Sequence, residues 1–264
     1  MHKESDKFGE NTVLEGITSI RALIDARRDP GSRNDRPIER ILFDEERLRK
    51  IGKEVGWLRA VGREYDFPVL PAPREEIERL ATGTTHGGLL AVCGQRILPP
   101  LLESDILPDG FYAMIEGVED PYNFGYALRS LYACGLSGAI LTERNWMSAA
   151  GVVARASAGA SERLSLFTAD PCAAAALFRR AGYRIVAADA DTEISLPHAN
   201  MKRPLFLLIG GEKRGLSQAL SDMADLTVRI PYGRRFDAAL SAASAATILG
   251  YEVLRQNQPP ATPE

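Results

Sequence analysis

From Phe111 onward, apolar runs of strand length alternate with longer helical patterns along the chain. Such alternation is typical of βαβ units, which build a parallel sheet covered by helices on both faces. Ligands of such sheets bind in the loops that follow the carboxyl ends of the strands. The sequence therefore predicts an α/β fold whose functional residues lie in those loops. Strands are expected at residues 112–118, 138–141, 163–167, 183–188, 205–209 and 226–230.

The first hundred residues form a smaller α/β pattern of their own. A proline-rich stretch at residues 97–110 separates it from the rest and is typical of a linker. A chain of 264 residues is also long enough for two cores. We therefore predict an N-terminal domain over residues 1–104 and a C-terminal domain over residues 105–264. In the first domain, helices are expected at 13–26, 45–65 and 74–80, and strands at 38–43, 68–70 and 88–94.

The charge balance argues against a generally basic, nucleic-acid-binding surface. The chain carries 32 Lys and Arg against 35 Asp and Glu, and its net charge is -3. Binding RNA would need a local patch, which Arg27, Arg28, Arg33 and Arg36 could supply. Acidic residues are interleaved with these arginines, so a solvated loop of mixed charge is the alternative interpretation.

Membrane and metal chemistry find no support in the sequence. No run approaches the roughly 18 apolar residues of a membrane span, and the polar N-terminus does not resemble a signal peptide, so the expected compartment is the cytosol. The three histidines are scattered without ligand spacing, and no metal site is expected. Cys93, Cys134 and Cys172 lie far apart in apolar surroundings and are expected to be buried thiols.

The first loop of interest reads "DPYNFGYALRS" at residues 120–130, after the first predicted strand of the C-terminal domain. Asp120 or Asn123 can cap a helix that begins near Phe124. The spacing puts Asn123 and Arg129 near the same opening of the predicted ligand site. A helix cap followed by a surface arginine would give the same pattern, so spacing alone leaves both interpretations open.

The second loop reads "LFLLIGGEKRGLS" at residues 205–217. A buried strand runs into Gly210 and Gly211, and a helix opens after Gly215. Glycines at the end of a strand allow a tight turn and expose backbone N–H and C=O groups to a ligand. The spacing matches neither GxxxxGK[ST] nor GxGxxG, which excludes a P-loop and a dinucleotide fingerprint. A plain strand–turn–helix remains the alternative.

The third loop lies within "VRIPYGRRFDAALSAASAATILGYEVLRQ" at residues 228–256. Ile230 and Pro231 end a predicted strand, and a helix rich in Ala and Ser begins near Leu240. Small side chains at this density are unusual on a solvent-facing helix. The helix is therefore expected to pack closely against another backbone or to lie against a ligand loop.

Together, the three loops resemble the three signature motifs of the SpoU-type (TrmH-like) RNA 2'-O-ribose methyltransferases of the SPOUT superfamily. "DPYNFGYALRSLYACG" is similar to the family pattern DPxNxGxxxRxAxAxG, "LLIGGEKRGLS" to LxxGNExxGLS, and "IPYGRRFDAALSAASAATILGYE" to IPMxxxxxSLNVSxAxxIxLYE. The stretch "ASAGASERL" also resembles the family's SxGA segment between the first two motifs. The resemblance covers the C-terminal domain nearly end to end. The N-terminal domain, closed by "TGTTHGGLLAVCGQR", resembles the family's L30e-like RNA-binding domain less tightly.

The resemblance implies a deep trefoil knot in the parallel sheet domain, S-adenosyl-L-methionine as cofactor, RNA as substrate and a homodimer. It implies that Arg129, Asn123 and Glu212 orient the ribose hydroxyl. Because an arginine side chain stays protonated in proteins, we expect Arg129 to position and stabilise rather than to act as a base. The loops that hold the cofactor would include Ile209, Gly210, Gly211, Gly215, Ile230, Pro231 and Leu240.

Two positions depart from the family pattern. Gly211 stands where the second motif has Asn, and Ser241 stands where the third motif has Asn; Ser241 can still exchange one hydrogen bond in the site. The departures leave open a catalytically weak knotted protein that binds RNA, and a methyltransferase that acts on another target. A hydrolase is a more distant alternative, because "THGG" faintly resembles an oxyanion loop but no GxSxG elbow is present.

Overall fold

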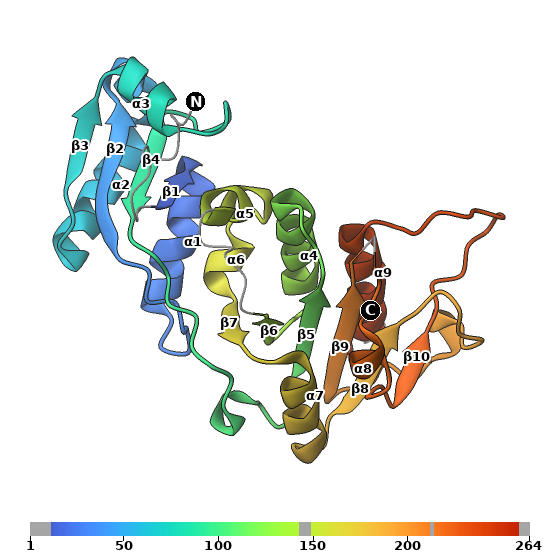
Figure 1. Ribbon diagram of the computed structural model, residues 1–264. Coiled ribbons are helices and arrows are strands. Elements are labelled where there is room, and N and C mark those ends of the chain that lie inside the picture. Colours follow the sequence, from blue (N-terminus) through green and yellow to red (C-terminus); the bar gives the residue numbers. More distant parts are fainter. Residues whose placement is uncertain (1–11, 143–148, 212–213, 259–264) are drawn as a thin grey trace, which may run out of the picture. The chain divides into compact units, whose positions relative to one another are not determined.

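The computed structural model of the chain describes residues 12–142, 149–211 and 214–258. These residues divide into two compact units (Figure 1). The N-terminal unit comprises Met1–Ile97 and Asn145–Arg163, and the C-terminal unit comprises Leu98–Arg144 and Leu164–Glu264. The first boundary between the two units therefore lies after Ile97, within the predicted linker. Residues 145–163, which the prediction assigned to the C-terminal domain, instead join the N-terminal unit.

The N-terminal unit is built on a four-stranded sheet in the order β1-β4-β2-β3. β4 pairs antiparallel with both β1 and β2, and β3 pairs parallel with β2. Helices α1 and α2 pack on this sheet, and Ala154 of α5 lies in the same core. The elements are β1 (Thr12–Glu15), α1 (Gly16–Arg28), β2 (Ile38–Asp44), α2 (Leu48–Tyr65), β3 (Val69–Ala72), α3 (Arg74–Leu80), β4 (Leu89–Cys93), α5 (Ala150–Ala156) and α6 (Ala160–Arg163).

The start of this unit corrects the sequence prediction. Residues 13–15, predicted as the beginning of a helix, belong to β1, which pairs with β4 from Thr12 opposite Cys93 to Glu15 opposite Leu90. Gly16, with a φ of +77°, then turns the chain into α1. A left-handed φ of this kind is one that glycine adopts readily. The long-range pairing with β4 decided the conformation of this segment.

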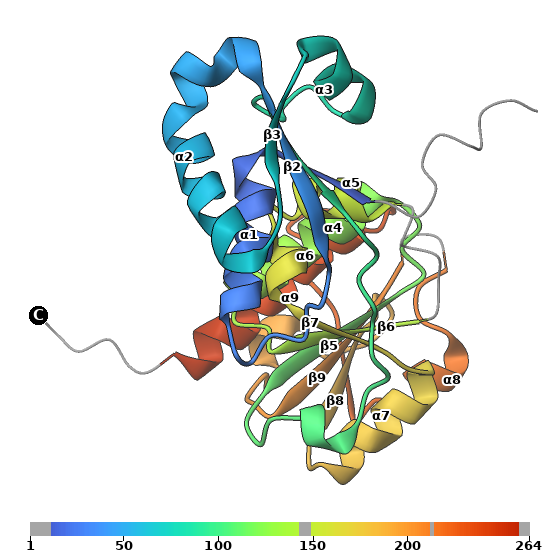
Figure 2. The same ribbon diagram turned by 90° about the vertical axis from the view of Figure 1, so that its left-hand side faces the viewer.

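The C-terminal unit is a six-stranded sheet in the order β10-β8-β9-β5-β6-β7, and all its pairings are parallel. The predicted parallel α/β fold is confirmed in this unit. Helices cover both faces, with α7 packed against one face and α9 beside β9 and α4 (Figure 2). The elements are β5 (Phe111–Glu116), α4 (Pro121–Ala133), β6 (Gly138–Leu141), β7 (Ser165–Thr168), α7 (Pro171–Arg180), β8 (Arg184–Ala188), β9 (Leu205–Gly210), α8 (Gln218–Ser221), β10 (Leu226–Val228) and α9 (Ala242–Asn257).

The last helix returns from the sheet edge to the middle of the unit. β10 is the edge strand, yet α9, which follows it, packs against α4 and β9. The end of α9 is tied to the segment that precedes β9, because Asn257 Nδ2 donates to the Met201 carbonyl at 3.0 Å and Gln256 Nε2 donates to the Ala199 carbonyl at 2.9 Å. The chain therefore crosses back over the strands that it has already formed. Within the described part of the chain, no helix is both long and apolar enough to cross a membrane.

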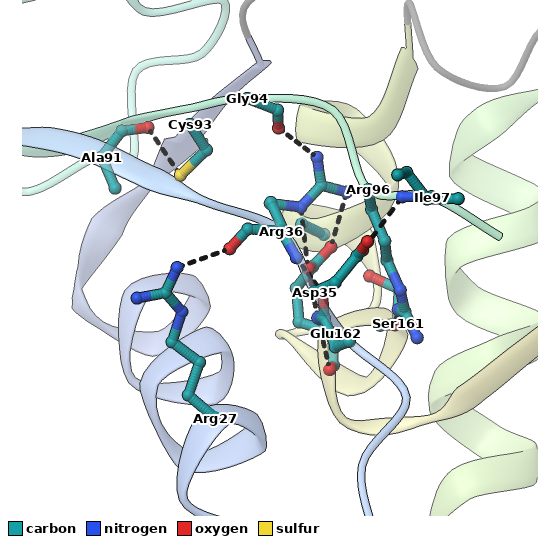
Figure 3. Close-up of polar contacts among 12 residues, drawn as sticks. Arg27, Asp35, Arg36, Ala91, Cys93, Gly94, Arg96, Ile97, Ser161 and Glu162 are labelled. Carbon is teal, nitrogen blue, oxygen red and sulfur yellow. Dashed lines mark hydrogen bonds and ion pairs between the residues drawn. The ribbon is translucent and has the colours of Figure 1, made fainter. Parts of the chain in front are cut away.

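Residues 149–163 are held in the N-terminal unit by a buried polar network (Figure 3). The Arg36 guanidinium donates to both carboxylate oxygens of Glu162, at 2.9 and 3.2 Å, and the two side chains are only 3% and 2% exposed. Asn34 Nδ2 donates to the same carboxylate at 2.8 Å. Arg96 Nη1 donates to the Ser161 carbonyl at 2.7 Å. The network fixes the residues before β2 and after β4 to residues 149–163.

Burial and the arginines act in opposite directions on Glu162. Burial by itself raises the pKa of its carboxyl, but the charges of Arg36 and Arg96 and the hydrogen bonds from Arg36 and Asn34 lower it by more. The net pKa lies below the ordinary value of 4.5. A carboxyl with a lowered folded-state pKa contributes stability above its unfolded-state pKa, and this stability is lost as the pH falls through the folded-state value.

We predict that Glu162→Gln strongly destabilises the N-terminal unit at neutral pH, because it leaves Arg36 buried without its counter-charge. Removing one partner of a buried ion pair costs about 3–5 kcal/mol. Urea denaturation followed by circular dichroism measures the loss, and the variant should also lose the part of the wild type's acid sensitivity that appears below pH 4.5. Glu78→Gln breaks an exposed pair with Arg74 and serves as the control, with an unchanged midpoint expected. Equal midpoints for wild type and Glu162→Gln would contradict the role of the network.

Candidate functional site

The candidate site begins where β5 and β9 end side by side. Their parallel register places Glu116, the last residue of β5, opposite Gly210, the last residue of β9. Parallel strands present their carboxyl ends at one edge, so the loops after both strands meet there. The loop after β5 turns at Gly117, which has a φ of +75°. The pairing therefore brings the first two motif loops to one edge of the sheet.

Gly211 lies against the loop that follows β5. A Cβ atom at this position would approach the Gly117 carbonyl oxygen to 2.4 Å and the Glu116 carbonyl oxygen to 3.2 Å. Contacts of 2.4 Å are far shorter than van der Waals separation, so a side chain at this position would force one backbone to move. The glycine that departs from the family pattern is thus required by the close approach of the two loops in this conformation.

The loop after β9 folds back on its own strand. Gly215 N donates to the Gly211 carbonyl at 2.9 Å, and a Cβ at Gly210 would lie 2.2 Å from the carbonyl carbon of Gly215. The turn therefore leaves no room for a side chain at Gly210 and displays backbone atoms at the sheet edge. Ile209, also predicted at this site, is the buried residue just before it, 1% exposed. Glu212 lies outside the described residues.

Glu116 is a site residue that the sequence prediction missed. Its Oε2 accepts a hydrogen bond from Ser217 N at 2.8 Å, which joins the end of β5 to the start of α8. The signal in the sequence was a single acidic residue at the end of an otherwise apolar strand, FYAMIE.

Helix α4 presents the predicted polar residues of the first motif. Asp120 is the N-cap, because its side chain accepts from Tyr122 N at 3.0 Å, and Pro121 occupies the first turn. Asn123 lies half-buried in the same turn, and Arg129 is exposed further along the helix. No hydrogen bond or ion pair holds the Arg129 guanidinium among the described residues. The arginine is thus available to an anionic or hydroxyl-bearing ligand.

Helix α9 packs on α4 at short range, as its small residues predicted. A Cβ at Gly250 would lie 3.1 Å from Leu131, and Thr247 Oγ1 donates to Ser130 Oγ at 2.7 Å. These pairs advance together along both helices, so the helices run in the same direction and their first turns share an end. Ser241 caps α9, because its Oγ accepts from Ser244 N at 3.2 Å. The Ser241 hydroxyl therefore also fixes the start of the helix.

The remaining predicted cofactor residues flank the loop between β10 and α9. Ile230 is half-buried and Pro231 is exposed after β10, which ends at Val228, earlier than predicted. Leu240 N donates to the hydroxyl oxygen of Tyr232 at 3.2 Å, which closes the loop. β10 pairs with β8 and is separated from β9 by that strand, so these residues reach the same edge of the sheet without being neighbours of Gly210 in it.

The arginines predicted to contact RNA have different surroundings. Arg36 is buried with Glu162, which excludes a contact with phosphate and corrects the prediction for this residue. Arg27 Nη2 donates to the Arg36 carbonyl at 3.0 Å, and Arg28 pairs with Glu64 at 2.8 Å. Arg33 is exposed. Of these four arginines, Arg27, Arg28 and Arg33 are accessible to solvent.

The cysteines are free thiols without a disulfide in the described residues. Cys93 is buried, as predicted, and burial raises its pKa to about 12. Cys134 and Cys172 are only half-buried, so the expectation of full burial was wrong for them. No group of three or more metal-ligating side chains occurs within residues 12–142, 149–211 and 214–258.

We predict that Gly211→Ala disturbs the sheet edge. The added methyl group must displace the Gly117 carbonyl, and overpacking of this kind costs about 1–3 kcal/mol. Thermal denaturation, followed through the unfolding transition of the C-terminal unit, measures the loss of stability. Gly233→Ala is the matched control, because nothing lies within 4 Å of the added atom and its melting temperature should be unchanged. A Gly211→Ala protein as stable as wild type would show that the two loops are not in fixed contact.

Comparisons with known proteins show which family the chain resembles. The model of the SpoU rRNA Methylase family matches residues 110–251. The 23S rRNA (guanosine-2'-O-)-methyltransferase RlmB of Shewanella oneidensis is 26% identical over 256 residues, which cover 93% of this chain and 98% of RlmB.

Solved structures share the fold. A crystal structure of an RNA 2'-O ribose methyltransferase matches 94% of this chain and 89% of its own with a TM-score of 0.75 at 24% identity. The SpoU methyltransferase AviRb from Streptomyces viridochromogenes, in complex with the cofactor AdoMet, also gives a TM-score of 0.75, at 23% identity, and the match covers 94% of this chain and 90% of AviRb. Because the family model spans more than half of the chain and includes all three motif loops, the protein belongs to the SpoU rRNA methylase family.

Proposed function

We propose that the protein transfers a methyl group from S-adenosyl-L-methionine to a ribose 2'-hydroxyl of tRNA or rRNA. Membership of the family makes it an RNA methyltransferase. The observation that carries the site is the contact between Gly117 and Gly211, which brings two backbone loops together beside the helix that bears Arg129.

The cofactor would lie along the loops at the carboxyl edge of the sheet. The turn at Gly210, Gly211 and Gly215 carries no side chains at these positions, and Gly215 is exposed, so the backbone at this edge suits a ligand with amino, carboxylate and ribose groups. When bound, S-adenosyl-L-methionine supplies an electrophilic methyl group. The residues proposed to hold it are Ile209, Gly210, Gly211, Gly215, Ile230, Pro231 and Leu240.

The chain's own groups would align the hydroxyl with the methyl group. Arg129 is exposed, and its guanidinium group would stabilise negative charge on the ribose oxygen or hold the adjoining phosphate. Asn123 and Glu212 orient the same hydroxyl from the two neighbouring loops. Ser241, whose Oγ caps α9, acts there chiefly by fixing the first turn of that helix. The proton leaves to solvent or to a phosphate.

We further propose that the C-terminal unit is knotted and forms a homodimer. The knot is supported by α9, which returns from edge strand β10 to lie beside α4 while its end is tied to Ala199 and Met201. The dimer is supported by exposed large side chains on α4 and α9, because an exposed apolar patch marks an interaction surface. Light scattering should give a molecular mass of twice the 28.8 kDa of one chain, and the mass of a single chain would contradict the dimer. These exposed residues are Tyr122, Tyr126, Ile248 and Tyr251.

The N-terminal unit is proposed to select the RNA, in the cytoplasm. Arg27, Arg28 and Arg33 keep guanidinium surface for phosphates, although Arg28 is paired with Glu64. Pairs exposed to solvent are weak and exchange readily. An Arg28→Ala, Arg33→Ala double variant should bind RNA more weakly, and unchanged affinity would exclude this surface.

We predict that Arg129→Ala abolishes methyl transfer and leaves the affinity for S-adenosyl-L-methionine unchanged. Loss of a group that orients or stabilises the reacting oxygen lowers rates by about 100- to 1000-fold. Transfer of labelled methyl groups to bulk tRNA and rRNA measures activity, and calorimetry measures cofactor binding. Arg180→Ala removes another exposed arginine of the C-terminal unit and should keep full activity. If Arg129→Ala is as active as wild type, the role given to this residue is wrong; a wild-type protein that binds RNA but transfers no methyl would favour a non-catalytic RNA-binding protein.

A further inference from the structure

The loop between β10 and α9 is exposed over its middle part. All nine residues from 231 to 239 are open to solvent, between the residues proposed to hold the cofactor on one side and Ser241 on the other. The loop projects away from the sheet (Figure 1). The whole loop runs from residue 229 to 241, and loops longer than about 12 residues without secondary structure of their own are usually either functional or linker segments. It contains the sequence Tyr-Gly-Arg-Arg-Phe, residues 232–236.

The two aromatic rings of this loop are placed but not covered. The Tyr232 hydroxyl accepts the Leu240 N–H at 3.2 Å, which ties the ring to the base of the loop. The ring centroids of Tyr232 and Phe236 are 6.0 Å apart, with an interplanar angle of 57°. Phe236 is nevertheless 60% exposed and Tyr232 42% exposed. In a tilted pair of this kind, each ring packs against the other, and the exposed parts of the rings can stack with a third aromatic group.

The charge of the loop is positive. Arg234 and Arg235 are exposed beside the rings, and the single acidic residue, Asp237, lies 3.7 Å from Arg235. The side chains of that pair are 92% and 86% exposed, so water screens the interaction and leaves the guanidinium available. Exposed aromatic rings next to arginines are the combination that binds single-stranded nucleic acid, with bases stacked on the rings and phosphates on the guanidinium groups.

We propose that Tyr232 and Phe236 form a stacking platform for an unpaired RNA base near the ribose that is methylated, and that Arg234 and Arg235 hold the adjoining phosphates. The proposal rests on the proposed function and adds the part of the C-terminal unit that grips the substrate. RNA is favoured over a protein partner because the loop starts and ends at residues of the proposed cofactor site, where the target nucleotide must arrive. The aromatic face of α4 and α9 separately offers a surface for a second chain.

Fluorescence anisotropy with a labelled single-stranded RNA of about 12 nucleotides tests the platform on the full-length protein. Stacking on an aromatic side chain contributes about 1–3 kcal/mol per base, so Phe236→Ala should weaken binding by about 5- to 150-fold. Phe236→Trp should retain it. The Arg234→Ala, Arg235→Ala double variant should reduce the slope of log K against log salt by about 1.4, since each phosphate contact contributes about 0.7.

Two controls separate this effect from general loss of surface. Leu102→Ala removes an apolar side chain with a similar exposure of 57%, and Arg180→Ala removes an exposed arginine; both should bind RNA as wild type does. Calorimetry with S-adenosyl-L-methionine and light scattering on Phe236→Ala should give wild-type affinity and mass. Unchanged RNA affinity in Phe236→Ala overturns the proposal. A fall in cofactor affinity or in mass that accompanies the loss of RNA binding also overturns it, because the loop would then serve the cofactor or the dimer. Failure of the proposed function would be seen instead as absence of methyl transfer in the wild type.

Discussion

The close contact between Gly117 and Gly211 is the constraint on which the candidate site depends. It follows from the parallel register of β5 and β9, whose last residues lie opposite each other at the sheet edge. Because Gly211 has no room for a side chain at the contact, the backbones of the two loops approach each other directly. Glu116 then ties the end of β5 to Ser217, so that the second motif loop is anchored at both ends. The departure at Gly211 from the family's Asn is, in this setting, a consequence of packing.

The N-terminal unit depends on a different interaction, the buried ion pair of Arg36 and Glu162. The pair fixes residues 149–163 to the sheet of that unit, although the chain on either side of this segment belongs to the C-terminal unit. Two further contacts act in the same way, because Arg155 forms an ion pair with Glu15 at 2.7 Å and Gly151 packs directly against the Val13 backbone. The stretch that resembles the family's SxGA segment therefore serves as part of the N-terminal unit's structure as well.

The sequence predicted the features of the fold that depend on local patterns. The six strands of the C-terminal unit, the loops that follow β5 and β9 and the close packing of the Ala- and Ser-rich helix all depend on residues near one another in the chain. Two of the misses, at β1 and Arg36, share one physical cause, which is pairing between distant segments. β1 is a strand because it meets β4, and Arg36 is buried because its partner Glu162 is 126 positions away. A periodicity argument sees neither partner, and so it read Arg36 as a surface residue.

Calorimetric titration of S-adenosyl-L-methionine into the purified protein tests the central claim most directly, because the function proposed for the loops at the sheet edge is to hold that cofactor. We expect saturable binding of one cofactor per chain, with competition by the demethylated product. A ligand at about 100 times its Kd should then stabilise the fold by about 2.7 kcal/mol. Absence of binding at millimolar cofactor would contradict the account, because the loops at the ends of β5 and β9 would then not form a cofactor site.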